Sequence, residues 1–300
     1  MPSSTVAESK AATVSNVAGL SRRPGFLRLF VQNRTALLGA VLVLFFALLA
    51  ITGPFLTPHD PDKPNLELRL QGPSVAYPFG TDEVGRDILT RIAYGARFSL
   101  MMGVVAMTIS ACLGVPLGLL GGYRGGRWDT GIMRGVDVLM TLPSIVLSIA
   151  IVSVLGPGII SVIIAVGITS TPAFARLTRA VALTLREQDF VSAARIVGAS
   201  EARILRLHIF PNSLPPLIVQ ASLGVGTTIL TASALGFLGL GVQPPTPEWG
   251  AMLSRARTYI SIAPHMVIFP GVAIALLVLG FNLLGDGLRD ALDPRMKQAS

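Results

Sequence analysis

The sequence predicts an all-α membrane protein with six transmembrane helices, and three observations support that fold class. Hydrophobic residues make up 51% of the 300 residues and charged residues only 13%, a balance too apolar for a soluble chain of this length. Six stretches are long enough to cross a bilayer as helices, which takes about 20 apolar residues. Basic residues gather between alternate stretches, so the net charge of +8 reflects membrane topology and not nucleic-acid binding.

Each predicted span is a mostly apolar run bounded by polar residues, glycine or proline. The six cover residues 36–56, 99–121, 136–155, 157–175, 214–235 and 264–285. Gly156, Pro157 and Gly158 interrupt helix, so we expect a tight hairpin between the third span and the fourth. The first span is long enough to cross the bilayer and lacks a convincing cleavage site, so we expect an uncleaved helix rather than a signal peptide.

The other segments divide the chain into tails, an external region and a core. We expect a cytoplasmic N-terminal tail over residues 1–35, and an external loop with a helix on the membrane surface over residues 57–98. A core of five spans over residues 99–290 and a cytoplasmic C-terminal tail over residues 291–300 follow. The surface helix is predicted from an apolar face beside charged residues, formed by Ile88, Leu89, Ile92 and Ala93.

The distribution of basic residues orients the predicted spans. Of the 24 Lys and Arg residues, 17 lie in the N-terminal tail, in residues 122–135 and 176–213, and at the C-terminus from Arg289 on, all on one side of the membrane. The opposite side holds 7. Because cytoplasmic loops carry the excess of Lys and Arg, the first side is predicted to be cytoplasmic. Both termini are then cytoplasmic as well.

A charged segment, residues 189–216, lies between the fourth and fifth spans and has the pattern of two short helices. Asp189 is the predicted N-cap of the first helix, Gly198 its end, and Ser200 the cap of the second. One face of the first helix carries small and apolar side chains at helical spacing, from Phe190, Ala193, Ala194 and Val197. We expect this cytoplasmic face to contact another protein, because small side chains allow a partner to approach closely.

The sequence shows no catalytic site or energy source of its own. A phosphate-binding loop would need Gly-Lys followed by Ser or Thr, and no Gly-Lys pair occurs. The histidines His59, His208 and His265 are scattered without a zinc-protease pattern, and the single cysteine, Cys112, cannot form a disulfide within the chain. We therefore expect a non-enzymatic chain with no bound cofactor or metal.

Two other kinds of membrane protein stay open on this evidence. An ion-coupled transporter is compatible with the polar residues on the last two spans, although no ionisable side chain lies clearly at mid-membrane. A channel needs no energy source and is compatible too. The polar residues in question are Gln220, Thr227, Thr228 and Asn282.

Two packing features are predicted within the spans. Asp137 lies near Arg134 at the cytoplasmic end of the third span, where a local ion pair is the simplest arrangement. Gly114, Gly118 and Gly122 repeat every four residues in the second span and form a groove that lets another helix come close. That helix belongs either to this chain or to another subunit.

Residues 189–212 resemble the cytoplasmic coupling motif of ABC importer permeases. The motif reads Glu-Ala-Ala, three residues, Gly, nine residues, Ile, one residue, Leu-Pro. Its alanines, glycine and proline are all present at its spacings, as Ala193, Ala194, Gly198 and Pro211. Ser192 stands in place of the glutamate, His208 of the isoleucine and Phe210 of the leucine.

Further segments resemble the C-type permease subunit of dipeptide, oligopeptide and glutathione importers, in the same order along the chain. They are residues 79–82 (Phe-Gly-Thr-Asp) with 85–87 (Gly-Arg-Asp), 243–250 (Gln-Pro-Pro-Thr-Pro-Glu-Trp-Gly), and 285–290 (Gly-Asp-Gly-Leu-Arg-Asp) with 292–294 (Leu-Asp-Pro). The resemblance covers nearly the whole chain after the N-terminal tail.

The resemblance implies a type I ABC importer in a bacterial cytoplasmic membrane, with the permease fold of that class. Such a subunit pairs with a second, different permease, two ATPase subunits beneath hold ATP and Mg, and an external peptide-binding protein delivers the solute. It implies ATP-driven import of di- or oligopeptides, glutathione included, by alternating access. A permease of the same group for nickel or another small solute is the alternative.

The coupling residues implied by the motif and its surroundings are Ser192, Ala193, Ala194, Arg195, Gly198, Arg203 and Pro211. The small residues would pack into an ATPase groove, and Pro211 would connect the motif rigidly to the fifth span. Arg195 and Arg203 would be polar contacts to the ATPase or to anionic lipid headgroups. Candidates for the translocation pathway, or for hydrogen bonds between packed helices, are Ser144, Gln220, Thr227 and Thr231.

Overall fold

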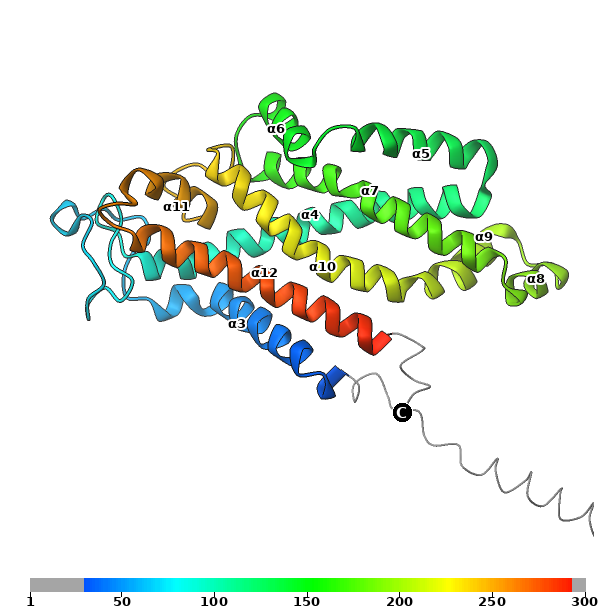
Figure 1. Ribbon diagram of the computed structural model, residues 1–300, viewed down its shortest axis with the longest axis horizontal. Coiled ribbons are helices and arrows are strands. Elements are labelled where there is room, and N and C mark those ends of the chain that lie inside the picture. The colour runs from blue at the N-terminus through cyan, green and yellow to red at the C-terminus, as the bar shows by residue number, and fades with distance from the viewer. Residues whose placement is uncertain (1–29, 293–300) are drawn as a thin grey trace, which may run out of the picture.

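The computed structural model describes residues 30–292, and the regular structure in this part is helical apart from one antiparallel bridge between Thr81 and Asp87. Five long helices run lengthwise through the bundle (Figure 1): α3 (Arg34–Leu56), α4 (Ile88–Arg124), α7 (Ile159–Arg186), α10 (Phe210–Phe237) and α12 (His265–Leu292). Shorter helices are α5 (Gly126–Met140), α6 (Ser144–Leu155), α8 (Asp189–Ile196), α9 (Glu201–Ile204) and α11 (Trp249–Ala256). Single 3-10 or π turns are η1 (Leu66–Leu68), η2 (Leu205–Ile209) and η3 (Arg257–Tyr259).

The five long helices are each long and apolar enough to cross a membrane, and they match five of the six predicted spans. Several of them extend beyond the predicted limits; α7 continues to Arg186 because the polar residues that follow the apolar run still favour helix. α6 and α7 are joined by Gly156, Pro157 and Gly158, as predicted. Of the two predicted tails, residues 1–29 and 293–300 lie outside the described part.

The third predicted span, residues 136–155, is wrong as a single straight helix. α5 ends at Met140, α6 begins at Ser144, and the two helices are bent by 87° at the break. Pro143 explains the break, because it has no N–H to donate and its ring disfavours helical backbone at Leu142 before it. The bent pair counts either as one broken span or as a re-entrant loop.

The helix predicted on the membrane surface within residues 57–98 is also wrong. α4 begins at Ile88 and runs unbroken from there through the second span. The Asp87 carboxylate caps it by accepting two backbone hydrogen bonds. Its apolar face is covered by protein instead of lipid. Ile88 and Ile92 are 1% and 4% exposed and belong to the same core cluster as Trp249 of α11.

The glycine groove of α4 packs against α7 of the same chain. A Cβ atom at Gly118 would lie 2.4 Å from the carbonyl oxygen of Ala175, and one at Gly122 would lie 2.6 Å from that of Arg179. A Cβ atom at Gly114 would lie 2.7 Å from the carbonyl oxygen of Thr171. The three glycines therefore let two helix backbones touch within this subunit, which decides between the two predicted alternatives.

Buried charges fasten the loop before α4 to the end of the bundle that carries α11. Arg91 is 1% exposed, donates from Nη2 to the Pro245 carbonyl at 3.1 Å, and lies 3.6 Å from an oxygen of Asp82. The same carboxylate oxygen accepts a hydrogen bond from Nε of Arg86 at 2.7 Å. Asp82 and Arg86, both within residues 79–87, therefore contact other parts of this same chain.

Glu248 caps α11 and is fully buried. Its two carboxylate oxygens accept hydrogen bonds from the N–H groups of Gly250 and Ala251, each at 2.8 Å. Burial raises the pKa of Glu248 to about 7, against the opposing effect of these two donors. The adjacent Trp249 donates from Nε1 to the Ile92 carbonyl at 3.0 Å, which fixes α11 to α4.

Candidate coupling segment and translocation cavity

The coupling segment, residues 189–212, projects from the end of the bundle opposite α11 (Figure 1). Gly198 ends α8 as predicted: its φ of +87° is left-handed, and the next N–H donates to the Ala194 carbonyl at 3.0 Å. Ser200 caps α9, also as predicted, by accepting a hydrogen bond from the N–H of Arg203 at 3.4 Å.

The predicted N-cap of α8 is one residue too late. Gln188 holds that position, and Asp189 is the first helical residue. An acidic side chain is favoured both as an N-cap and in the first turn, where it meets the positive end of the helix dipole. The sequence pattern alone therefore does not separate the two positions.

The predicted contact face of α8 lines an open groove of about 440 Å³. Apolar side chains in and beside it are strongly exposed: Val197, in the lining, at 86% and the neighbouring Ile196 at 87%. Exposed apolar side chains of this size beside small residues indicate a surface that another protein covers. The groove is lined by Phe190, Ala193, Ala194, Val197, Gly198, Ala199, Arg203 and His208.

Three of the implied coupling residues lie outside this groove. Ser192 is exposed on α8 but is absent from the groove lining, and Pro211 lies in the first turn of α10. Arg195 stays about half exposed and contacts α4 and α9 instead: its Nη2 donates to the hydroxyl of Tyr123 at 3.4 Å and its Nε to Glu201 at 3.3 Å. These two hydrogen bonds hold the pKa of Arg195 above its ordinary value.

The coupling segment continues into α10 without a break in helical structure. α9, the π turn η2 and α10 follow one another directly, and together they form one of the candidate spans. Pro211 lies just after the π turn, a wider turn that suits a residue unable to donate in an ordinary helix. Asn212 donates from its side chain to the His208 carbonyl at 2.6 Å and adds a bond across this junction.

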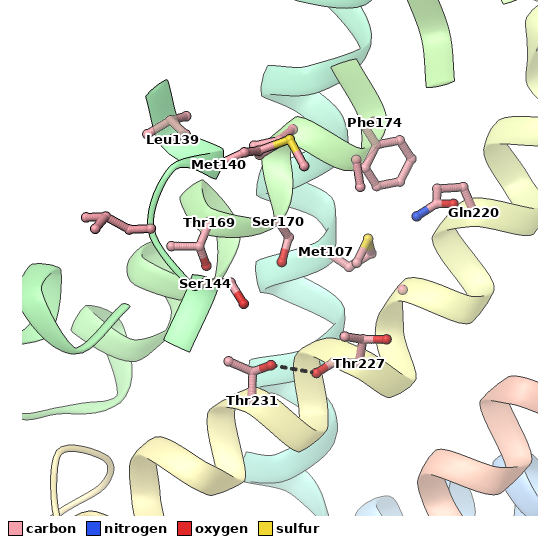
Figure 2. Close-up of a pocket in the computed structure, with 14 residues that line it drawn as sticks. Met107, Leu139, Met140, Ser144, Thr169, Ser170, Phe174, Gln220, Thr227 and Thr231 are labelled. Atoms are coloured by element: carbon pink, nitrogen blue, oxygen red, sulfur yellow. Dashed lines mark hydrogen bonds between the residues drawn. The ribbon is translucent and has the colours of Figure 1, made fainter. Parts of the chain in front are cut away.

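All four predicted pathway residues line one open cavity of about 420 Å³, walled by α4, α5, α6, α7 and α10 (Figure 2). Gln220, Thr227 and Thr231 share one face of α10 with Gly224 and face Ser144 at the start of α6. The break between α5 and α6 creates the opposite wall. The lining residues that sequence reasoning missed are Met107, Leu139, Met140, Leu142, Thr169, Ser170, Pro172, Ala173, Phe174 and Gly224.

The cavity offers hydrogen bonds without charge, since none of its lining side chains is ionisable. Hydroxyl groups come from three helices, and the amide of Gln220 adds both a donor and an acceptor. Met107 and Met140 supply flexible apolar walls that adapt to different shapes. This chemistry suits a polar but uncharged part of a solute, with tolerance for varied side chains.

Gln220 also lines a second cavity of about 530 Å³ between α7, α10 and α12, nearer the coupling segment. Its wall is mainly apolar and includes Pro215, Pro216 and Leu223, with Arg289 as its one ionisable lining residue. Gln220 is the residue that the two linings share. It therefore lies at the boundary between them.

The predicted ion pair between Asp137 and Arg134 is wrong. Asp137 instead accepts a hydrogen bond from Nη2 of Arg176, at 2.6 Å, and so connects α5 to α7. Sequence neighbours suggested the local partner, whereas the antiparallel course of α7 brings an arginine distant in sequence closer. No group of three or more His, Cys, Asp or Glu side chains able to hold a metal ion occurs in residues 30–292.

Long apolar helices that wall an open cavity with uncharged hydroxyl groups indicate a multi-pass membrane transport protein. The model of the family described as "Binding-protein-dependent transport system inner membrane component" matches residues 114–298. The model described as "N-terminal TM domain of oligopeptide transport permease C" matches residues 25–73. The chain belongs to the family of binding-protein-dependent transport system inner membrane components.

Curated relatives match over nearly their whole length. The dipeptide transport system permease protein of Alkalihalophilus pseudofirmus is 52% identical, over 89% of this chain and 88% of the relative. The di/tripeptide transport system permease of Pseudomonas aeruginosa is 47% identical, over 92% and 93%. The glutathione transport system permease of Escherichia coli is 50% identical, over 91% and 90%.

The fold is shared with a solved transporter. The structure titled as an inward-facing conformation of the MetNI methionine ABC transporter aligns with a TM-score of 0.55 and 21% identity, over 68% of this chain and 96% of that one. A second crystal form of the same transporter aligns with a TM-score of 0.56 and 20% identity. The predicted ABC importer permease fold is thus confirmed.

Proposed function

We propose that this chain is the permease subunit of an ATP-driven importer that carries di- and oligopeptides across a bacterial cytoplasmic membrane. The observation that carries the proposal is the continuous helix from α9 through α10, which joins the exposed groove of the coupling segment to the wall of the polar cavity. Relatives named as permeases for dipeptides, di- and tripeptides or glutathione support peptides as the solute.

Two separate ATPase subunits would supply the energy, binding ATP and Mg that this chain does not hold. The groove fits this role because Ala193, Ala194 and Gly198 leave space for a partner's side chains, and Arg203 at the groove offers a polar contact. Ile196 and Val197 would lose their exposed apolar surface on docking, which favours association.

A second, different permease and an external solute-binding protein complete the proposed importer. The coupling segment and both termini face the cytoplasm in this proposal, in line with 17 of the 24 basic residues on that side. The end with α11 and the loop before α4 then faces outward.

Transport would follow alternating access. Closure of the ATPases moves α8 and α9. α10 follows because α9, η2 and α10 form one continuous helix. The wall that carries Gln220, Thr227 and Thr231 then shifts against α5 and α6, so the cavity opens first to one side of the membrane and then to the other. The uncharged lining contacts peptide amide groups during passage.

The test is reconstitution of the chain with its second permease, two ATPases and binding protein in proteoliposomes. We expect a labelled dipeptide to accumulate only with hydrolysable ATP, and unlabelled dipeptides or glutathione to compete where nickel ions do not. Uptake by the isolated chain under an ion gradient would favour an ion-coupled transporter, and competition by nickel alone would favour the metal alternative.

A further inference from the structure

A polar contact with Tyr123, a residue outside the coupling motif, fastens the coupling segment to α4. The Tyr123 hydroxyl donates a short hydrogen bond to a carboxylate oxygen of Glu201. Arg195 donates to the other oxygen of that carboxylate at 3.3 Å and to the Tyr123 hydroxyl at 3.4 Å. The guanidinium carbon of Arg195 also lies 5.9 Å from the centre of the Tyr123 ring. One residue each from α4, α8 and α9 therefore meets at this point.

Apolar packing holds the tyrosine in place beneath the contact. Tyr123 is 8% exposed and packs in one cluster with Leu119 of α4. Val191 of α8 and Ile204 of α9 are fully buried in the same cluster. The ring is fixed by this packing, whereas the hydroxyl provides the directional contact to the coupling segment.

The other connections of the coupling segment lead to different helices. Along the chain it continues into α10, and it follows α7 after Gln188. α4 is distant in sequence and lies against α7 through its glycine groove, while Met107 of α4 lines the polar cavity. A movement of α8 and α9 therefore reaches α4 by two routes: directly through the cluster that contains Tyr123, and through α10, whose Thr228 hydroxyl donates to the Gly103 carbonyl of α4 at 2.9 Å.

We propose that Tyr123 is a positioning residue that makes α4 follow the coupling segment, so that the α4 and α10 walls of the cavity move together. This inference rests on the proposed function. Without the hydroxyl, the remaining pair of Arg195 and Glu201 joins α8 only to α9, and both side chains are about half exposed, so the pair contributes little rigidity. The apolar cluster and the contact of α10 with α4 remain, but the coupling segment loses its directional bond to α4, so more ATP is hydrolysed for each dipeptide imported.

The test measures how many ATP molecules the reconstituted complex hydrolyses for each dipeptide imported. For Tyr123→Phe we expect this ratio to rise roughly fivefold, the factor that corresponds to one hydrogen bond, with normal recovery of the complex. Tyr94→Phe is the matched control, since Tyr94 lies on the same helix and its hydroxyl has no hydrogen-bond partner among the described residues. That variant should keep the wild-type ratio.

Glu201 variants separate coupling from simple stability. Glu201→Gln keeps an acceptor for the tyrosine and should stay near the wild-type ratio, whereas Glu201→Ala should match Tyr123→Phe. The double variant Tyr123→Phe/Glu201→Ala should be no worse than either single one. A purely structural role would lower uptake and hydrolysis in proportion and leave the ratio unchanged, which would overturn the inference. Failure of the wild-type complex to import a dipeptide with ATP would instead overturn the proposed function.

Discussion

Asp129 on α5 and Arg179 on α7 form a bidentate ion pair, with oxygen–nitrogen distances of 2.5 and 2.7 Å. Together with the pair of Asp137 and Arg176, it holds the first half of the bent helix pair against α7. Because Met140 at the end of α5 lines the polar cavity, the position of α5 determines the shape of that cavity.

Removing the bidentate pair should destabilise the protein more than removing the single one. Asp129→Asn is expected to lower the free energy of unfolding by about 1 kcal/mol, because a bidentate pair at a partly buried carboxylate is stronger than an exposed one. Asp137→Asn is the matched control: the Asp137 side chain is 57% exposed, against 19% for Asp129. Thermal unfolding of the purified chain measures both, and equal losses would contradict the ranking.

The contact between α4 and α7 should tolerate no added atom at Gly118. Gly118→Ala places a methyl group into the α7 backbone and is expected to cost about 1–3 kcal/mol of stability, because neither backbone can move aside easily. Gly131→Ala makes the same change within α5, where nothing lies within 4 Å, and should be neutral or slightly stabilising. Chemical or thermal unfolding checks the pair, and a neutral Gly118→Ala would show that the helices separate more readily than their packing indicates.

Local sequence signals predict much of this structure, but they do not show contacts between residues far apart in the chain. The caps around Gly198 and Ser200 and the apolar spans depend on neighbouring residues, so they are readable from the sequence. The bend at Pro143 is hidden by apolar residues on both sides, although proline was the available signal. The contact of Tyr123 with Glu201 joins residues far apart in the chain, and nothing local marks it.

The pathway residues show the same division. Ser144, Gln220, Thr227 and Thr231 were predicted because polar side chains on the third and fifth spans are visible in the sequence. Thr169 and Ser170 carry equally useful hydroxyls, but α7 shows no comparable stripe, so only the fold brings them to the cavity. Whether these residues contact a solute stays a prediction.

Stability should depend on pH through Glu248. Its folded pKa, about 7, exceeds the ordinary value of 4.5, so the folded state binds the proton more tightly than the unfolded state. The stabilisation is fully present below pH 4.5 and is lost as the pH rises through 7. Glu248→Gln resembles the protonated form. It should reduce the change of the melting temperature with pH between about pH 5 and 8, a range that spans the shifted pKa. Glu67→Gln, at an exposed carboxylate, should leave the wild-type slope, and a wild-type slope in Glu248→Gln would be evidence against this origin.

A hydroxyl inside the cavity should matter more for transport than the same hydroxyl outside it. Thr231 and Thr108 each donate to the carbonyl four residues earlier, at 2.9 and 2.8 Å, but only Thr231 lines the cavity. Thr231→Val should reduce ATP-driven dipeptide uptake several-fold, because the cavity loses a polar group, whereas Thr108→Val should not. Equal uptake by the two variants would contradict the assignment of this cavity to the transport pathway.

Gly198 should be the position where added bulk uncouples the permease. A side chain there enters the groove, and most residues would also strain its φ of +87°. Gly198→Asn isolates the steric effect, because asparagine tolerates the left-handed conformation better than other side chains. We expect weaker association with the ATPase subunits and a large loss of peptide uptake, without a matching loss of thermal stability.

The most direct measurement is ATP-driven dipeptide uptake by proteoliposomes that contain the full complex with either wild-type chain or Gly198→Asn. We predict uptake by the wild-type complex that stops when ATP is withheld, and little uptake by the variant at the same amount of permease. Normal ATPase association and normal uptake with Gly198→Asn, or wild-type uptake that does not need ATP, would contradict the assignment of residues 189–212 as the link between ATP hydrolysis and transport.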